Sequence, residues 1–399
     1  MTETVNETQG ALAGVRILDF GRYVAGPYCA TLMADFGADV IRIERPGGGE
    51  DRGIAPVSAD GSGDGALFQQ MNRNKRSLTF DPASPQARDI IIRLVRSADV
   101  VVVNVPHRAL KRMGLDYATL RAIREDIILC NLSSFGSIGP WASRPGFDSV
   151  GQAMCGSAYL SGQGDVPFRT PITWVDHATG LYAAFGVMVA LFERQRSGCG
   201  QELGGSLLAS ALSFSATFLI EEALTGLDRK AIGNRSFLNG PTDTFRTADG
   251  WVVTQVVGQP IFERWAGLIG EPAWIADPRF ATDQLRGVNG AELSARMALW
   301  CAVRTSEEAL DALAGAGIPA GPILSPSQAL AHPQVQALEI LHTPGGGAGA
   351  VFRTPIELSA TPATIRSAAP AAGAHTEELL AELGFSGDEI HGLRQSSTI

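Results

Sequence analysis

Three groups of basic residues in the first third of the chain have the types and spacing of an anion-binding site. Arg42, Arg45 and Arg52 bracket residues 47–49, which are all glycine and let backbone N–H groups approach an anion. The other two groups are Arg73, Lys75 and Arg76, and Arg108, Lys111 and Arg112. One such group alone is best explained as solvated charges on a surface loop. Three groups beside predicted strand ends favour a polyanion such as a nucleotide with several phosphates.

Asp176 is a second candidate for chemistry. It stands at the predicted start of an apolar helix over 177–198, after a strand-like segment at 170–175. Aspartate is a favoured N-cap residue, and this interpretation needs no function. A carboxylate at a helix N-terminus also stays ionised at neutral pH, and it is then available as a nucleophile.

Alternating strands and helices must position these residues. Short apolar or β-branched runs predict strands at 15–20, 38–44, 76–81, 98–104 and 127–135. Helical patterns lie between them at 27–37, 84–98 and 116–126, the second with Ser84 as N-cap and Pro85 at its first position. This alternation predicts a parallel, Rossmann-like sheet with helices on both faces, which binds ligands at the carboxyl ends of its strands.

The remainder of the sequence predicts a second domain and then a segment that leads the chain back to the first domain. Helices are expected at 177–198 and 206–226, and the texture changes at about residue 235. A hairpin over 245–257 turns at Asp249-Gly250, and further helices indicate an α+β domain. The Gly-, Pro- and Ala-rich segment 343–373 is an extended return, and a last helix lies at 375–385.

Composition excludes several classes of function. The 399 residues include 41 acidic residues and 32 Lys+Arg, and this net charge of −9 argues against a nucleic-acid binder. Five cysteines without a CxxC pair, and six scattered histidines, make a disulfide framework or a metal site unexpected. The polar N-terminus does not resemble a signal peptide, and the apolar stretch 178–192 is shorter than a bilayer span. We expect a cytoplasmic protein that does not bind membranes.

Motifs of several common enzyme classes are absent from the sequence. The turn after the first predicted strand reads FGRYVAG, so a GxGxxG dinucleotide fingerprint is missing there. P-loop, GxSxG and HExxH motifs are also missing. The residues alone therefore indicate an α/β enzyme with an anion site near residues 42–52.

At these residues the sequence resembles the class III CoA-transferases, the family of formyl-CoA and carnitine CoA-transferases. The stretches that carry the resemblance span almost the whole chain in the family's order. They are GVRILDF (14–20), AGPYCATLMADFGADVIRIERPG (25–47), NRNKRSLTFD (72–81), ADVVVVN (98–104), ALKRMGLDY (109–117), GFDSVGQAMCG (146–156), VDHATGLYAAFGVMVALFERQRSGCGQ (175–201), ADGWV (248–252), GIPAGPILS (317–325) and HTEELLAELGF (375–385).

The resemblance implies an acyl-CoA:carboxylate CoA-transferase in which Asp176 is the nucleophile. Asp176 would form a mixed anhydride with the donor acyl group and then an aspartyl-CoA thioester. CoA would be a substrate and not a tightly bound cofactor, the other substrate would be a small carboxylic acid, and no metal is implied. The family's CoA-binding positions fall on Tyr23, Val24, Ala25, Arg45, Lys75, Asn104, Val105 and Arg112.

The resemblance also implies a domain plan and an oligomer. A large Rossmann-like domain begins with 10–212, is left through a linker at 213–234, and is completed by 366–399 after a returning linker at 329–365. A smaller α+β domain at 235–328 is inserted between the linkers. Two such chains would interlock as a homodimer.

Departures from the family pattern bear on the substrate and on the alternatives. Val24 replaces a glutamine of the formyl-CoA enzyme, and its loop of consecutive glycines has no match at 233–262, so oxalate is not the expected acid. An α-methylacyl-CoA racemase of the same fold carries a catalytic histidine where this chain has Phe147. That racemase and a catalytically silent CoA-binding protein are the alternatives. His177 as a base and Arg169 as a partner of a second substrate carboxylate stay open.

Overall fold

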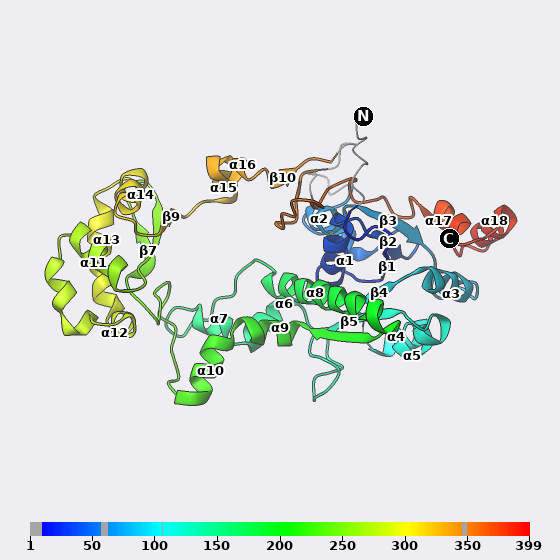
Figure 1. The fold of residues 1–399 in the computed structure, drawn as a ribbon, viewed down its shortest axis with the longest axis horizontal. Coiled ribbons are helices and arrows are strands. Elements are labelled where there is room, and N and C mark those ends of the chain that lie inside the picture. Colours follow the sequence, from blue (N-terminus) through cyan, green and yellow to red (C-terminus); the bar gives the residue numbers. More distant parts are fainter. Residues whose placement is uncertain (1–9, 57–62, 106, 345–348) are drawn as a thin grey trace. The chain divides into compact units, whose positions relative to one another are not determined.

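The computed structural model describes residues 10–56, 63–105, 107–344 and 349–399. The chain divides into two compact units, each with its own core (Figure 1). The large unit combines residues 1–155, 170–223 and 338–399, so both ends of the chain belong to it. The second unit consists of residues 156–169 and 224–337.

A parallel six-stranded sheet forms the centre of the large unit. Its strands are β1 (Arg16–Asp19), β2 (Asp39–Glu44), β3 (Lys75–Thr79), β4 (Val100–Val103), β5 (Ile128–Ser133) and β6 (Glu202–Ser206). Their spatial order is β3-β2-β1-β4-β5-β6, and every neighbouring pair is parallel. The direction of winding therefore reverses between β1 and β4, which is where a doubly wound sheet opens a crevice for ligands. The sequence did not predict β6, because ELGGS lacks an apolar run.

Helices cover both faces of this sheet (Figure 1). Helices α1 (Ala25–Asp35) and α8 (Trp174–Ser197) share one core with Ile17, Val40 and Val100. The other face packs on α3 (Ala87–Ser97), α5 (Tyr117–Ile123), α17 (Thr376–Glu382) and α18 (Gly387–Gln395). Successive strand residues point to opposite faces, so Leu18 and Val101 belong to this second core. Further elements of this unit are α2 (Ala66–Asn72), α4 (His107–Met113), α6 (Asp148–Met154), α9 (Leu207–Phe214), β10 (Leu341–His342) and β11 (Val351–Phe352), with η1 at Glu50–Gly53.

A buried carboxylate fixes the returning C-terminal segment to the N-terminal part. Asp35 binds the guanidinium of Arg73 at 2.6 Å and accepts a hydrogen bond from Thr354 Oγ1 at 2.6 Å. Asn74 donates to Asp35 at 2.8 Å and to the Thr364 carbonyl at 2.7 Å. Because breaking a buried pair leaves an uncompensated charge, this network holds the return in place.

Three predicted helix boundaries differ in the structure. Helix α3 begins at Ala87 with Gln86 as its N-cap, so Ser84 and Pro85 precede it. The predicted helix 206–226 is two helices, α9 and α10 (Ala216–Thr225), bent by 71°. Helix α8 begins at Trp174, so the strand-like segment 170–175 is not a strand. Helix α8 is long and apolar enough to cross a membrane, but half of its apolar window is buried in the protein, as in a core helix.

The second unit is an α+β body with an aromatic core. The expected hairpin is present as β7 (Thr242–Arg246) and β8 (Trp251–Gln255), and β9 (Ala320–Pro322) extends this antiparallel sheet. Phe262, Trp265 and Phe280 are fully buried against it. Its helices are α7 (Ser157–Leu160), α11 (Gln259–Leu268), α12 (Asp283–Val288), α13 (Gly290–Ala302), α14 (Ser306–Gly315), α15 (Pro326–Ala331) and α16 (Pro333–Ala337), with η2 at Pro272–Ala276 and η3 at Pro278–Phe280.

Residues 156–169 belong to the second unit, although the sequence placed them in the large domain. Gln163 forms a β-bridge with Ile232, and the Gly233 N–H donates to the Gly162 carbonyl at 3.3 Å. These backbone contacts join two segments that are about seventy residues apart, and their sequence carries no strand pattern.

Candidate active site

The carboxyl ends of β1 and β4 bring two predicted ligand-binding loops together. After β1, the backbone of Arg22 pairs with the Asn104 side chain, which accepts from its N–H at 2.8 Å and donates to its carbonyl at 2.7 Å. Tyr23 adopts a left-handed conformation with φ 63°, and Val24 and Ala25 lead into α1. Asn104 thus links the Tyr23–Ala25 loop to the Asn104–Val105 loop, both at the point where the strand order reverses.

Asp176 lies in the first turn of α8, next to the start of α1. Thr173 is the N-cap, so Asp176 is the third helical residue and not the cap. The helices approach closely at Gly180, where an added Cβ would lie 2.7 Å from the Ala25 carbonyl oxygen. The His177 ring also packs on Tyr28 of α1 at a centroid distance of 4.9 Å. These contacts place Asp176 beside the end of the Tyr23–Ala25 loop.

A second carboxylate, which sequence reasoning missed, adjoins Asp176. Asp148 begins α6, and its Oδ2 accepts hydrogen bonds from the backbone N–H of Val175 at 2.7 Å and of Asp176 at 3.1 Å. The preceding Phe147 packs edge-on against the Tyr23 ring, with centroids 5.4 Å apart. In the GFDSVGQ stretch, Phe147 stands where a racemase has its histidine, and Asp148 directly follows it. This aspartate was the one feature of the sequence that could have indicated a second carboxylate.

The electrostatics of Asp176 differ from the expectation of an ionised helix-terminal carboxylate. Burial, with only 9% of the residue exposed, and then the negative charge of Asp148 raise the pKa of Asp176 to about 7. A helix N-terminus favours an anion through its free N–H groups. Here Asp148 already accepts two of those N–H groups, so they do not stabilise the charge of Asp176.

His177 and Arg169, whose roles the sequence left open, are both placed by the structure. The His177 Nδ1 lies 2.7 Å from the Thr173 carbonyl, which fixes the ring on its own helix. Arg169 belongs to the second unit and has interactions of its own.

The first basic group contributes one exposed guanidinium. Arg42 is buried and binds Asp51 at 2.7 Å, and Arg52 binds Glu44 at 2.6 Å and Asp64 at 2.8 Å. Arg45 differs, because 59% of its side chain is exposed.

The carboxylate of Glu50 contacts two exposed arginines next to the Tyr23–Ala25 loop. It binds Arg22 at 2.7 Å and lies 3.7 Å from Arg45 Nη2, and the Tyr23 hydroxyl donates to it at 3.3 Å. Arg22, which the sequence did not indicate, therefore shares the Glu50 carboxylate with Arg45.

The side chains of the second basic group, which the sequence assigned to a polyanion site, bind carboxylates of the large unit. Lys75 is fully buried, and its Nζ donates to Asp19 Oδ2, the Pro27 carbonyl and Asn72 Oδ1 at 2.8 to 3.1 Å. Burial lowers the pKa of Lys75 to about 8, although Asp19 favours its charged form. Arg73 binds Asp35, as described above. Arg76 pairs with Asp39, Glu378 and Glu382.

The third basic group lies on α4, directly after the Asn104–Val105 loop. Lys111 and Arg112 are exposed, and the Arg108 side chain lies outside the described residues. Of the predicted CoA-binding cations, Arg45 and Arg112 are thus accessible to a ligand, whereas Lys75 is not.

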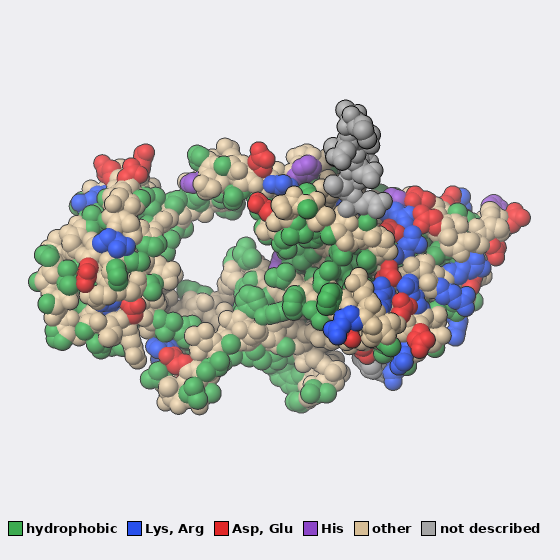
Figure 2. All heavy atoms as spheres, in the orientation of Figure 1, with side chains coloured by type: hydrophobic (Ala, Val, Ile, Leu, Met, Phe, Trp, Pro, Cys, Tyr) green, Lys and Arg blue, Asp and Glu red, His purple; other side chains and the backbone are tan. Residues whose placement is uncertain are grey.

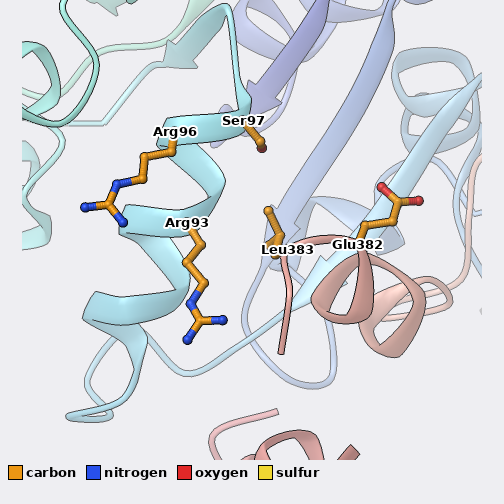
Figure 3. A pocket seen from close by; sticks show the side chains of 5 residues that line it. All are labelled: Arg93, Arg96, Ser97, Glu382 and Leu383. Atoms are coloured by element: carbon orange, nitrogen blue, oxygen red, sulfur yellow. The ribbon is translucent and has the colours of Figure 1, made fainter. Parts of the chain in front are cut away.

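A cavity of about 410 Å³ lies elsewhere in the large unit, between α3 and the end of α17 (Figure 3). Arg93, Arg96, Ser97, Glu382 and Leu383 line it. Ser97 precedes β4, and Glu382 binds Arg16 at the start of β1. This cavity therefore faces the amino ends of the strands, opposite the edge that carries Asn104.

The described residues contain no group of three His, Cys, Asp or Glu side chains arranged for a metal ion. All five cysteines are free thiols, four of them buried.

Comparison with known proteins gives consistent matches over nearly the full chain. A model of CoA-transferase family III matches residues 12–376. A succinyl-CoA–D-citramalate CoA-transferase of Chloroflexus aurantiacus is 34% identical, over 97% of this chain and 98% of its own. A succinate–glutarate CoA-transferase of Agrobacterium fabrum is 33% identical, over 96% and 98%.

A solved structure shares the fold. The crystal structure of a CAIB/BAIF family protein from Brucella suis superposes with a TM-score of 0.83 at 32% identity, covering 94% of this chain and all of that protein.

The buried charge of Asp176 predicts a stability effect. We expect Asp176→Asn to raise the free energy of unfolding by about 2 to 4 kcal/mol near pH 8, because the variant removes an anion destabilised by burial and by Asp148. The raised pKa makes this destabilisation largest above pH 7 and absent below the unfolded value near 4, so the gain should vanish as the pH falls. Urea denaturation at several pH values measures it. A gain of equal size at all pH values would contradict the assignment.

Proposed function

The chain belongs to CoA-transferase family III and transfers CoA between acyl-CoA thioesters and carboxylic acids, and we propose that Asp176 is the nucleophile of this transfer. The observation that carries the proposal is the position of Asp176, buried in the first turn of α8 beside the Tyr23–Ala25 loop. A carboxylate suits this reaction, because it has the chemistry of both acids being exchanged and is regenerated unchanged.

The reaction proceeds through two kinds of intermediate on Asp176. Its carboxylate oxygen attacks the thioester carbonyl of the donor, the C–S bond breaks, and CoA thiolate leaves a mixed anhydride. The thiolate attacks the aspartyl carbonyl, the anhydride C–O bond breaks, and the donor acid departs from an aspartyl-CoA thioester. The acceptor carboxylate attacks this thioester and expels the thiolate. This gives a second mixed anhydride. The thiolate attacks the acyl carbonyl of that anhydride, the bond from this carbonyl carbon to the bridging oxygen breaks, and the new acyl-CoA forms while the oxygen stays on the restored carboxylate of Asp176.

Burial of Asp176 supports this route. Mixed anhydrides hydrolyse readily, so the site has to exclude water while the thiolate remains bound. Only 9% of Asp176 is exposed, so most of the residue is shielded from water.

We assign CoA to the crevice at the carboxyl ends of β1 and β4. In this proposal Tyr23 and the backbone of the Tyr23–Ala25 loop lie on one side of CoA, because the Val24 and Ala25 side chains are buried, and Asn104 and Val105 lie on the other. The exposed guanidinium groups of Arg45, Arg22 and Arg112 bind its phosphates. Lys75 acts indirectly, because its buried ammonium binds Asp19 and the Pro27 carbonyl and so holds the loop between them.

The acids exchanged are dicarboxylic in this proposal. The two curated relatives described above are named for succinyl-CoA with citramalate and for succinate with glutarate. Oxalate is disfavoured, because Val24 and residues 233–262 lack the polar and glycine-rich features of the formyl-CoA enzyme. A racemase reaction is also disfavoured, since the phenyl ring of Phe147 cannot transfer a proton.

A homodimer is part of the proposal, and one exposed apolar face supports it. Along α8, Leu181, Tyr182, Phe185, Met188, Val189 and Phe192 are exposed. Their spacing of three and four residues puts them on one side of the helix, and Figure 2 shows apolar side chains gathered there. Soluble monomers rarely leave so contiguous an apolar surface open to water, so a second copy of this chain would cover it.

The nucleophile assignment predicts loss of turnover with retained binding. Asp176→Asn should abolish CoA transfer from succinyl-CoA while CoA binding, measured by calorimetry, stays within a few-fold of wild type. Mass spectrometry of peptides from the wild-type enzyme should find an acyl or CoA adduct on Asp176. The matched control is Asp165→Asn, an exposed aspartate of the second unit, which should keep full activity. Wild-type turnover by Asp176→Asn would refute the assignment.

The CoA site predicts a binding defect at Arg45. Arg45→Ala should raise KM for the acyl-CoA about tenfold and leave kcat nearly unchanged, because its phosphate contact exists equally in the ground and transition states. Arg121→Ala, at an exposed arginine on α5, is the control and should behave as wild type. An effect confined to kcat would count against Arg45 as a CoA anchor.

The exposed α8 face predicts the oligomeric state. Wild-type protein should have twice the mass of one chain by light scattering, and Phe185→Glu should shift it to the monomer, because Phe185 is 68% exposed at the centre of that face. Leu299→Glu, at a position 69% exposed on α13, should remain dimeric. A monomeric wild type would show the dimer proposal to be wrong.

A further inference from the structure

Asp148 makes contacts that none of the reaction steps above requires. It is a buried carboxylate, 4% exposed, and it reaches from α6 to the backbone of the turn that carries the nucleophile. Gln152, one turn along α6, donates its amide N–H to the other carboxylate oxygen. The Gln152 amide is itself fixed by the Thr170 N–H and by the carbonyls of Thr170 and Ile172.

We propose that Asp148 is a positioning residue for the reaction: it fixes the backbone of the nucleophile, and its charge sets the pH range in which Asp176 attacks a thioester. The inference rests on the proposed role of Asp176 as nucleophile. Asp148 itself touches no reacting atom, since it acts through the backbone of α8 and through space.

The positioning part follows from how α8 begins. The first N–H groups of a helix lack partners within the helix, and the N-cap Thr173 makes no side-chain capping bond. Asp148 supplies the missing acceptor from a different helix. Because it accepts from two successive N–H groups, including that of Asp176 itself, it fixes both the rotation of this turn and the direction of the nucleophile.

The charge part follows from the groups around Asp176. Helix α6 contributes Asp148, α8 itself contributes His177, and α1 carries Tyr28, whose ring packs on His177, whereas α9 carries no titratable side chain. After burial, Asp148 is the neighbour whose charge raises the pKa of Asp176. Like charges disfavour each other, so neutralising Asp148 should lower the pKa of Asp176 and extend activity to lower pH.

The test compares Asp148→Asn/Gln152→Leu with Gln152→Leu alone. An asparagine keeps an oxygen for the two N–H groups but places its amide against the Gln152 amide, so both variants carry leucine at 152 to remove that clash. The pair then differs in the charge at residue 148. The measurement is kcat/KM for succinyl-CoA against pH, since this ratio reports the pKa of the free enzyme.

We expect the acid limb of the profile to move down by about one pH unit in the double variant relative to Gln152→Leu. A third variant, Asp148→Ala/Gln152→Leu, loses the acceptor as well and should lose kcat while KM for the acyl-CoA is retained. Identical acid limbs in the first two variants, with Asp176→Asn inactive, would overturn this inference and leave the proposed function standing. An active Asp176→Asn would overturn both.

A second measurement applies if the double variant is inactive. The pH-dependent stability gain of Asp176→Asn should shrink when it is introduced into the Asp148→Asn/Gln152→Leu background, because the repulsion it relieves is already reduced. An unchanged gain would contradict the charge coupling without any assay of turnover.

Discussion

The carboxylate of Asp176, which we propose as the nucleophile, has to be negatively charged to attack a thioester, and its burial opposes that charge. Moving an ion out of water is costly unless donors or opposite charges compensate it. The start of α8 could supply such donors, but Asp148 accepts two of them. Asp176 is therefore held in a fixed direction by a group that also repels its charge. The close approach of α8 to α1 at Gly180 places the turn that carries Asp176 near the loop after β1.

The basic residues around the β1 loop divide into those whose side chains are buried and those whose side chains are exposed. Arg42, Arg73 and Lys75 are buried and bind carboxylates inside the large unit. Buried pairs are weak contributors to stability but are costly to break, so they fix the loops in one arrangement. Arg22 and Arg45 stay at the surface and share Glu50. A phosphate at that position would compete with Glu50 for the same two guanidinium groups.

The sequence was sufficient for features that depend on local pattern. Apolar runs such as VVVV of β4 predicted the parallel sheet, and alternation with helices predicted that both of its faces are covered. It failed where partners are distant in the chain. Asp148 and Asp176 are 28 residues apart, and nothing local indicates that one binds the backbone of the other. The ion pair of Lys75 was hidden for the same reason, since its partner Asp19 is 56 residues away.

The raised pKa of Asp176 is compatible with the role of nucleophile that we propose for it at neutral pH. Near pH 7, a carboxyl group with a pKa of about 7 is still about half ionised, so the loss of the reactive form is about twofold. The ionised half is more basic and less solvated than an exposed carboxylate, and both properties favour attack on a thioester. As the new C–O bond of this proposed reaction forms, charge moves from Asp176 to the thioester oxygen. Repulsion from Asp148 therefore raises the energy of the ionised Asp176 more than that of the transition state. The energy difference between the two becomes smaller, which lowers the barrier to attack.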